Sequence, residues 1–139
     1  MDKIVPPGFA RVDLGEGFSE KLGDVYVNRE TRTVRWQVMP EHANPTGACH
    51  GGALASFADA QIVASYGDPV GWSAHLPTIS LAVDYLAPIP VGAWVEAVVT
   101  LDRVTRTMIF SRATFLVDGR TVGRSTAIYR NADRAGEQS

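Results

Sequence analysis

The sequence predicts an α+β fold in which an antiparallel sheet packs against one long buried helix. Several segments alternate apolar and polar side chains with the period of two that is typical of half-buried strands. One segment, residues 51–66, instead has a helix-forming composition and is apolar nearly all round. Because parallel strands need crossover connections that are usually helical, one helix among so many strands argues against alternating β-α-β units.

The first two strands are expected around residues 25–27 and 34–38. Valines and Trp36 alternate there with polar side chains, on either side of the polar residues 28–31. This pattern predicts a hairpin. Residues 40–47 are rich in residues that break regular structure, so we expect a loop between the hairpin and the helix.

The predicted helix covers residues 51–66, and Gly67 is a natural stop signal. Its many alanines favour helix formation and would let a sheet approach closely. Because apolar side chains surround it, we expect a buried helix rather than a surface one.

Four more strands are expected after the helix, over residues 78–86, 93–101, 106–117 and 120–130. The last two flank Asp118-Gly119, a strong signal for a two-residue hairpin turn. Residues 131–139 are expected to form a frayed polar tail. The chain of 139 residues has the size of one domain, spanning residues 1–139.

Composition and charge exclude several classes of protein. The net charge is −2, so no overall basic field marks a nucleic-acid binder, although residues 103–139 carry +4 against −6 in residues 1–102. The single Cys49 excludes an intrachain disulfide and any cysteine-based metal site. No apolar run approaches the ~20 residues that cross a membrane, and the N-terminus lacks the pattern of a secretion signal. We therefore expect a cytoplasmic protein with no metal ligands and no nucleic-acid or membrane partner.

The predicted helix begins just after the sequence Asn-Pro-Thr-Gly-Ala-Cys-His, residues 44–50. The first N–H groups of a helix have no partner within it and lie at the positive end of its dipole. Glycine at positions 51 and 52 lets a ligand approach this backbone closely. Such a turn can stabilise a developing oxyanion, so Gly51 is a catalytic candidate and Gly52 a substrate-binding candidate.

Asp59 is the one charged residue between His50 and Gly67. Burying a carboxylate on an apolar helix costs on the order of several kcal/mol unless it is paired, neutralised or open to a cleft. In a cleft it can act as a general base on water or as a nucleophile. The sequence leaves both roles open.

The pattern Asn-Pro-x-Gly-x-x-His-Gly-Gly, with an aspartate eight residues after the first glycine of the final pair, resembles the hotdog-fold acyl-CoA thioesterases. Residues 78–88 also resemble the strand that follows the helix in the phenylacetyl-CoA (PaaI-like) group of that family. The resemblance implies a sheet wrapped around one long central helix. It also implies hydrolysis of an aryl or short- to medium-chain acyl-CoA without a cofactor, coenzyme A being part of the substrate.

The resemblance implies a role for each matching residue. The Gly51 N–H would polarise the thioester carbonyl, and Asp59 of the facing subunit would be the base or the nucleophile. His50 and Asn44 would orient the thioester or the loop before the helix, and Thr78 would help to hold the water. The site would then need a homodimer, and a tetramer made of two dimers is expected.

Four further side chains are candidates for binding substrate. Arg103 and Arg106, around a turn between strands, either bind the phosphates of coenzyme A or are solvated charges at strand ends. Phe57, like Trp72, either lines the acyl pocket or belongs to the core.

Two alternative functions stay open on the same fold. One is a non-catalytic module that binds acyl-CoA, although such a module would be expected to have lost the acid at position 59. The other is a hydratase or dehydratase. The resemblance to those enzymes would imply a different pattern, in which a histidine follows the aspartate by a few residues. The five residues after Asp59, Ala-Gln-Ile-Val-Ala, contain none.

Overall fold

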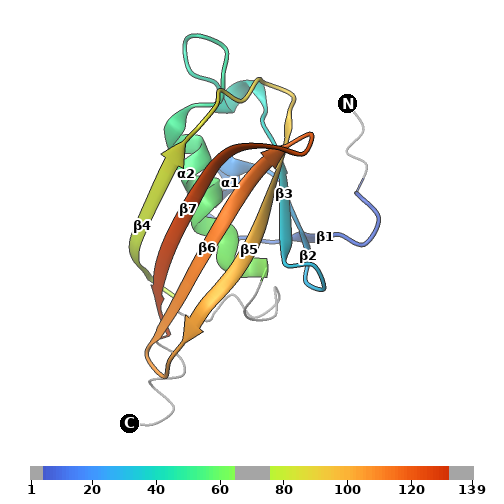
Figure 1. The fold of residues 1–139 in the computed structure, drawn as a ribbon. Coiled ribbons are helices and arrows are strands. Elements are labelled where there is room, and N and C mark those ends of the chain that lie inside the picture. The colour runs from blue at the N-terminus through green and yellow to red at the C-terminus, as the bar shows by residue number, and fades with distance from the viewer. Residues whose placement is uncertain (1–4, 65–75, 132–139) are drawn as a thin grey trace.

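The computed structural model describes residues 5–64 and 76–131, which form the predicted α+β arrangement (Figure 1). The strands are β1 (Ala10–Val12), β2 (Val25–Asn28), β3 (Thr33–Gln37), β4 (Thr78–Tyr85), β5 (Trp94–Val104), β6 (Met108–Val117) and β7 (Arg120–Arg130). The helices are α1 (Ser19–Leu22) and α2 (Gly51–Asp59), with two 3₁₀ helices, η1 (Pro40–His42) and η2 (Ala60–Ala64).

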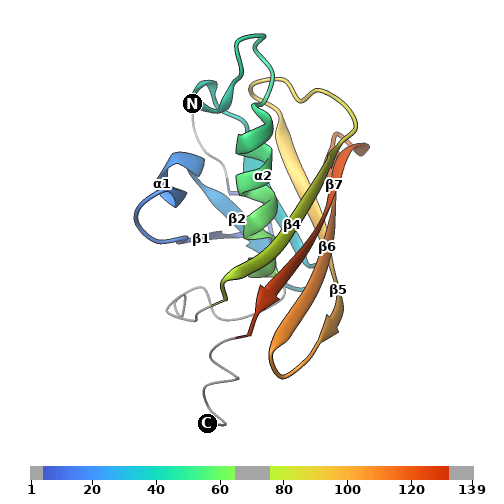
Figure 2. The same ribbon diagram turned by 90° about the vertical axis from the view of Figure 1, so that its left-hand side faces the viewer.

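The strands of these residues form one sheet in the order β1-β2-β3-β5-β6-β7-β4, and every neighbouring pair is antiparallel. The sheet curves around α2, and α1 lies on the opposite side of that helix (Figure 2). β4 follows the helix in the chain and forms one edge of the sheet, beside β7. Within the described residues, the side of β4 that faces away from β7 therefore has no partner strand.

Both predicted hairpins are confirmed. β2 pairs with β3 across residues 29–32, and β6 pairs with β7 across Asp118 and Gly119. These two turn residues have φ angles of 49° and 76°, and a type I′ turn requires positive φ at both positions. β1 and α1 were not predicted, because three and four residues are too few to show a periodic pattern.

The central helix begins at Gly51 as predicted, but its α-helical part ends at Asp59 and continues as the 3₁₀ helix η2. Where the α-helix gives way to the 3₁₀ helix, Nε2 of Gln61 donates to the carbonyl of Ala58 at 2.9 Å. Gln61 is buried, and its amide also joins Ser111 and Ser125 of the sheet at 2.7 and 2.9 Å. The predicted end at Gly67 lies outside the described residues.

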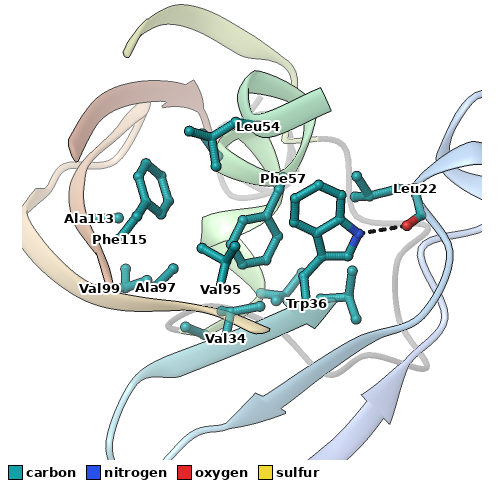
Figure 3. Close-up of a cluster of buried hydrophobic side chains, with 14 of the residues drawn as sticks. Leu22, Val34, Trp36, Leu54, Phe57, Val95, Ala97, Val99, Ala113 and Phe115 are labelled. Atoms are coloured by element: carbon teal, nitrogen blue, oxygen red, sulfur yellow. Dashed lines mark hydrogen bonds between the residues drawn. The ribbon is translucent and has the colours of Figure 1, made fainter. Parts of the chain in front are cut away.

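Phe57 occupies the middle of the core between helix and sheet (Figure 3). Its ring stacks on Trp36 at 5.1 Å between centroids and tilts against Phe115 at 5.9 Å. Burying one such ring contributes about 1.5–3 kcal/mol, so these contacts hold the helix on the sheet. The indole N–H of Trp36 donates to the carbonyl of Leu22 at 2.7 Å, which ties α1 to the same core.

Asn131, predicted to begin the polar tail, is instead part of the fold. It is 1% exposed, and its N–H donates to the carbonyl of Thr107 at 2.8 Å. Residues 132–139 lie outside the described part. No helix within residues 5–64 and 76–131 is both long and apolar enough to cross a membrane.

Candidate active site

His50 caps the N-terminus of α2. Its backbone is extended, with φ −62° and ψ 136°, and its Nδ1 accepts the N–H of Gly52 at 2.8 Å. A Cβ on residue 52 would lie 3.0 Å from that ring nitrogen, so any other residue there would crowd the cap. The Gly52 N–H, predicted to face substrate, is therefore engaged within the chain.

Gly51 is the first residue of α2, and its N–H has no acceptor among the described residues. Its carbonyl accepts the hydroxyl of Tyr85, at 2.6 Å, and a Cβ on residue 51 would lie 3.4 Å from the Tyr85 ring. The helix dipole adds positive charge at this end. The free N–H of Gly51 thus has the surroundings of an anion-binding donor.

Asn44 shapes the loop before the helix. Its side-chain oxygen accepts the N–H and hydroxyl of Thr46, at 2.9 and 2.7 Å, and the N–H of Ala48, at 3.1 Å. Backbone bonds from Asn44 to Ala48 and from Cys49 to Ile89 hold the loop beside the sheet. Within this chain, Asn44 therefore positions the backbone that leads to His50.

Cys49 is not a nucleophile in this setting. Burial raises the pKa of its thiol to about 11, so the thiol stays protonated at neutral pH. Its sulfur lies 3.5 Å from the carbonyl oxygen of His50. The residue is a partly buried apolar side chain, packed against the core.

Asp59 is the last residue of α2, and Thr78 at the start of β4 contacts its side chain. The Thr78 hydroxyl donates to Oδ1 of Asp59 at 2.6 Å. The Tyr129 hydroxyl donates to the Asp59 backbone carbonyl at 2.7 Å. Burial, and then the charge of Asp59, raise the pKa of Tyr129, which keeps this donor protonated. No hydrogen bond to Oδ2 occurs among the described residues, so that oxygen is open to a ligand.

A cavity of about 220 Å³ lies beside Asp59 and Thr78. Its walls are largely apolar and include Leu14, Leu22 and Val63. Asp59 is the one charged side chain among the described residues that line it. The arrangement places a carboxylate and a hydroxyl at the wall of an apolar chamber.

Gly51 and Asp59 lie at opposite ends of α2. Eight residues of helix separate them by about 12 Å at 1.5 Å per residue. A thioester carbonyl and the water that attacks it lie much closer together than this. One chain therefore does not bring both groups to the same reacting bond.

Arg103 and Arg106 are exposed at the β5–β6 turn. Neither forms an ion pair within residues 5–64 and 76–131. The turn leads into Ile109, which pairs with Tyr129, the residue that contacts Asp59. The turn therefore lies at the Asp59 end of the sheet. Arg103 pairs with Phe110, the residue after Ile109, so its side chain is on the face opposite Tyr129. Binding of phosphate by the two arginines stays a prediction.

Phe57 does not line this cavity. It is 1% exposed and belongs to the core, which was one of the two alternatives that the sequence left open. Its position follows from the helix period, since Leu54, Phe57 and Ala58 share the face turned toward the sheet. Trp72, the other aromatic candidate, lies outside the described residues.

Sequence reasoning missed the partners that hold the site. Tyr129 and Gln61 fix the end of α2, and Tyr85 contacts its start. His42, in the segment expected to be a loop, is buried, and its ring tilts against Trp36 at 4.8 Å between centroids. The one signal of these partners in the sequence was a glutamine inside an apolar helix, because a buried polar side chain needs hydrogen-bond partners.

Known proteins are similar to this chain in sequence and in fold. A Pseudomonas aeruginosa protein named "Putative esterase PA0474" is 24% identical over 132 residues, which cover 90% of this chain and 96% of the relative. A mutant of the phenylacetic acid degradation protein PaaI from Thermus thermophilus has a TM-score of 0.62 at 22% identity, over 89% of this chain and 93% of the other. A hypothetical thioesterase from Streptococcus pneumoniae, solved with coenzyme A, has a TM-score of 0.59 at 18% identity, over 91% and 90%.

The family assignment rests on the sequence match. The profile of the thioesterase superfamily matches residues 46–124, from the loop before α2 to β7. This range includes the glycine pair, Asp59 and Thr78. The fold agrees, with one antiparallel sheet wrapped around a central helix. The chain belongs to the thioesterase superfamily and has its hotdog fold.

Proposed function

We propose that the protein hydrolyses acyl-CoA thioesters carrying an aryl or a short- to medium-chain acyl group, giving the free acid and coenzyme A. The observation that carries the proposal is the Asp59 carboxylate, bound on one oxygen by Thr78 and open to an apolar cavity. A relative bears the name of an esterase, and a structural neighbour was solved with coenzyme A. Both support an ester of coenzyme A as the substrate.

In the proposed reaction, Asp59 takes a proton from water while the water oxygen attacks the thioester carbonyl carbon. The free N–H of Gly51 donates to the carbonyl oxygen as its negative charge develops. The tetrahedral intermediate then breaks its C–S bond, and the coenzyme A thiolate leaves and takes up the proton. Thr78 holds Asp59 and the water in place, which favours the general-base route over direct attack by the carboxylate.

We further propose that two chains share each site, because β4 contacts both ends of α2. Thr78, at the start of β4, contacts Asp59, and Tyr85, at its end, contacts Gly51. Edge strands with unpaired backbone readily pair with another chain, and Ile79 on this strand is 50% exposed. Antiparallel pairing of β4 with its copy across a two-fold axis would bring Asp59 of one chain toward Gly51 of the other.

The remaining candidates take supporting roles in this proposal. Arg103 and Arg106, exposed at the end of the sheet nearest Asp59, would bind phosphates of coenzyme A. His50 and Asn44 shape the backbone that presents the Gly51 N–H. A tetramer built from two such dimers stays a prediction.

A thiol-release assay over aryl-, short- and long-chain CoA esters tests the proposed function. We expect hydrolysis of aryl or medium-chain esters, unchanged after dialysis against a metal chelator. Tight binding of one ester without any thiol release would favour the non-catalytic module instead. Addition of water to an enoyl-CoA without release of the thiol would favour a hydratase.

A further inference from the structure

The short helix α1 is fixed firmly against the core. The turn before it contains Gly15 and Gly17, with φ angles of 88° and 89° that glycine adopts without strain. At its end, the carbonyl of Leu22 accepts the Trp36 indole N–H at 2.7 Å. The segment is therefore a built part of the wall rather than a loose terminus.

His42 provides a second anchor for α1. Its Nδ1 accepts the N–H of Met39 at 2.9 Å, so Nε2 carries the ring proton and donates to the carbonyl of Lys21 at 2.8 Å. The carbonyl of His42 also accepts the N–H of His50, at 2.7 Å. α1 is thus held in a fixed position relative to the N-terminus of α2.

Two cavities lie along the groove between α1 and α2. The first, of about 220 Å³, contains Asp59, and the second, of about 350 Å³, contains His50 and Gly52. Phe18, Leu22 and Ser56 line both. Ligand pockets usually measure about 300–1,000 Å³, so the Asp59 cavity alone lies below that range and the two together lie within it.

Phe18 is the boundary residue that can be changed without disturbing the core. Its side chain is 74% exposed, whereas Leu22 is 5% exposed and belongs to the core cluster. A large apolar ring left in water beside two cavities contributes little to folding. Because it lines both cavities, it lies where the two meet.

We propose that Phe18 sets the length of the acyl group that the site accepts. The inference rests on the proposed function, since the ligand in the Asp59 cavity is the acyl group of a thioester. With Phe18 in place, a compact acyl group fills the apolar Asp59 cavity. With a small residue at position 18, a longer chain extends along α2 into the cavity beside His50.

The test compares kcat/KM for hexanoyl-CoA and dodecanoyl-CoA in the wild type, Phe18→Ala and Phe18→Trp. In an apolar pocket, one methylene changes kcat/KM by about 10-fold or more. The ratio of kcat/KM for dodecanoyl-CoA to that for hexanoyl-CoA should therefore rise at least about 10-fold in Phe18→Ala. The same ratio should fall in Phe18→Trp. Val98→Ala, on the face of the sheet away from α2, is the control and should leave the ratio unchanged.

Binding of non-hydrolysable thioether analogues of the two esters, measured by calorimetry, separates this inference from the proposed function. If the wild type hydrolyses no ester but Phe18→Ala still gains affinity for the dodecanoyl analogue, the proposed function fails and the role of Phe18 stands. If neither the kinetic ratio nor the relative affinity changes in Phe18→Ala, the role of Phe18 is wrong.

Discussion

The variant Asp59→Asn is expected to lose at least about 10²-fold in kcat while it folds normally. General-base catalysis is worth about 10²–10⁴-fold, and the amide cannot take a proton from water. The amide has nearly the same shape as the carboxylate, so its oxygen can still accept the Thr78 hydroxyl that contacts Oδ1 at 2.6 Å. Thiol release measured with the best substrate gives the change in kcat, and the thermal midpoint checks the fold.

Asp102→Asn is the matched control for this variant. The Asp102 carboxylate is partly exposed and lies 2.8 Å from Arg112 on the sheet, away from the cavity. Exposed ion pairs contribute only about 0–1 kcal/mol, so both activity and thermal midpoint should stay close to wild type. If Asp59→Asn keeps more than a tenth of the wild-type kcat, Asp59 is neither base nor nucleophile.

Gly51→Pro should lower kcat by about 10²–10³-fold, the usual loss when one oxyanion donor is removed. Proline has no N–H, and it is well tolerated at the first position of a helix, which Gly51 occupies. The residue before a proline must be extended, and His50 already is, at φ −62° and ψ 136°. The local backbone thus accepts the proline, and the loss should appear in kcat, not in the yield of folded protein.

Gly51→Ala is the control for the proline variant, because alanine keeps the N–H. Its Cβ would lie 3.4 Å from the Tyr85 ring, at the edge of ordinary contact, so we expect much smaller losses. Equal activity of the alanine and proline variants would show that the Gly51 amide is not the donor.

The sequence was informative where a pattern is long or a turn is chemically distinctive. The 11-residue strand β7, the Asp118-Gly119 turn and the start of α2 at Gly51 were all predicted. β1 and α1 were too short to show a period. The change to η2 depends on Gln61, whose partners lie 50 and 64 residues away in the chain.

In the candidate site, too, some features were predictable from the sequence and others depend on contacts between distant residues. The chain order placed Asp59 and Gly51 on one helix, and the family resemblance suggested Thr78 as a neighbour of the acid. Their contact spans 19 residues and depends on how β4 returns along the helix, which only the fold reveals. The sequence could not decide the place of Phe57, because an aromatic residue near a site suits a pocket wall and a core equally well by type.

A complementation experiment tests most directly whether two chains share one site. Two differently tagged variants, Asp59→Asn and Gly51→Pro, are coexpressed, and the dimer carrying both tags is purified. In a shared arrangement this mixed dimer has one intact site of two, because one chain supplies Gly51 and the other Asp59. It should therefore recover about half of the wild-type activity, while each parent dimer stays at about 1% or less. A mixed dimer as inactive as its parents would contradict the shared site.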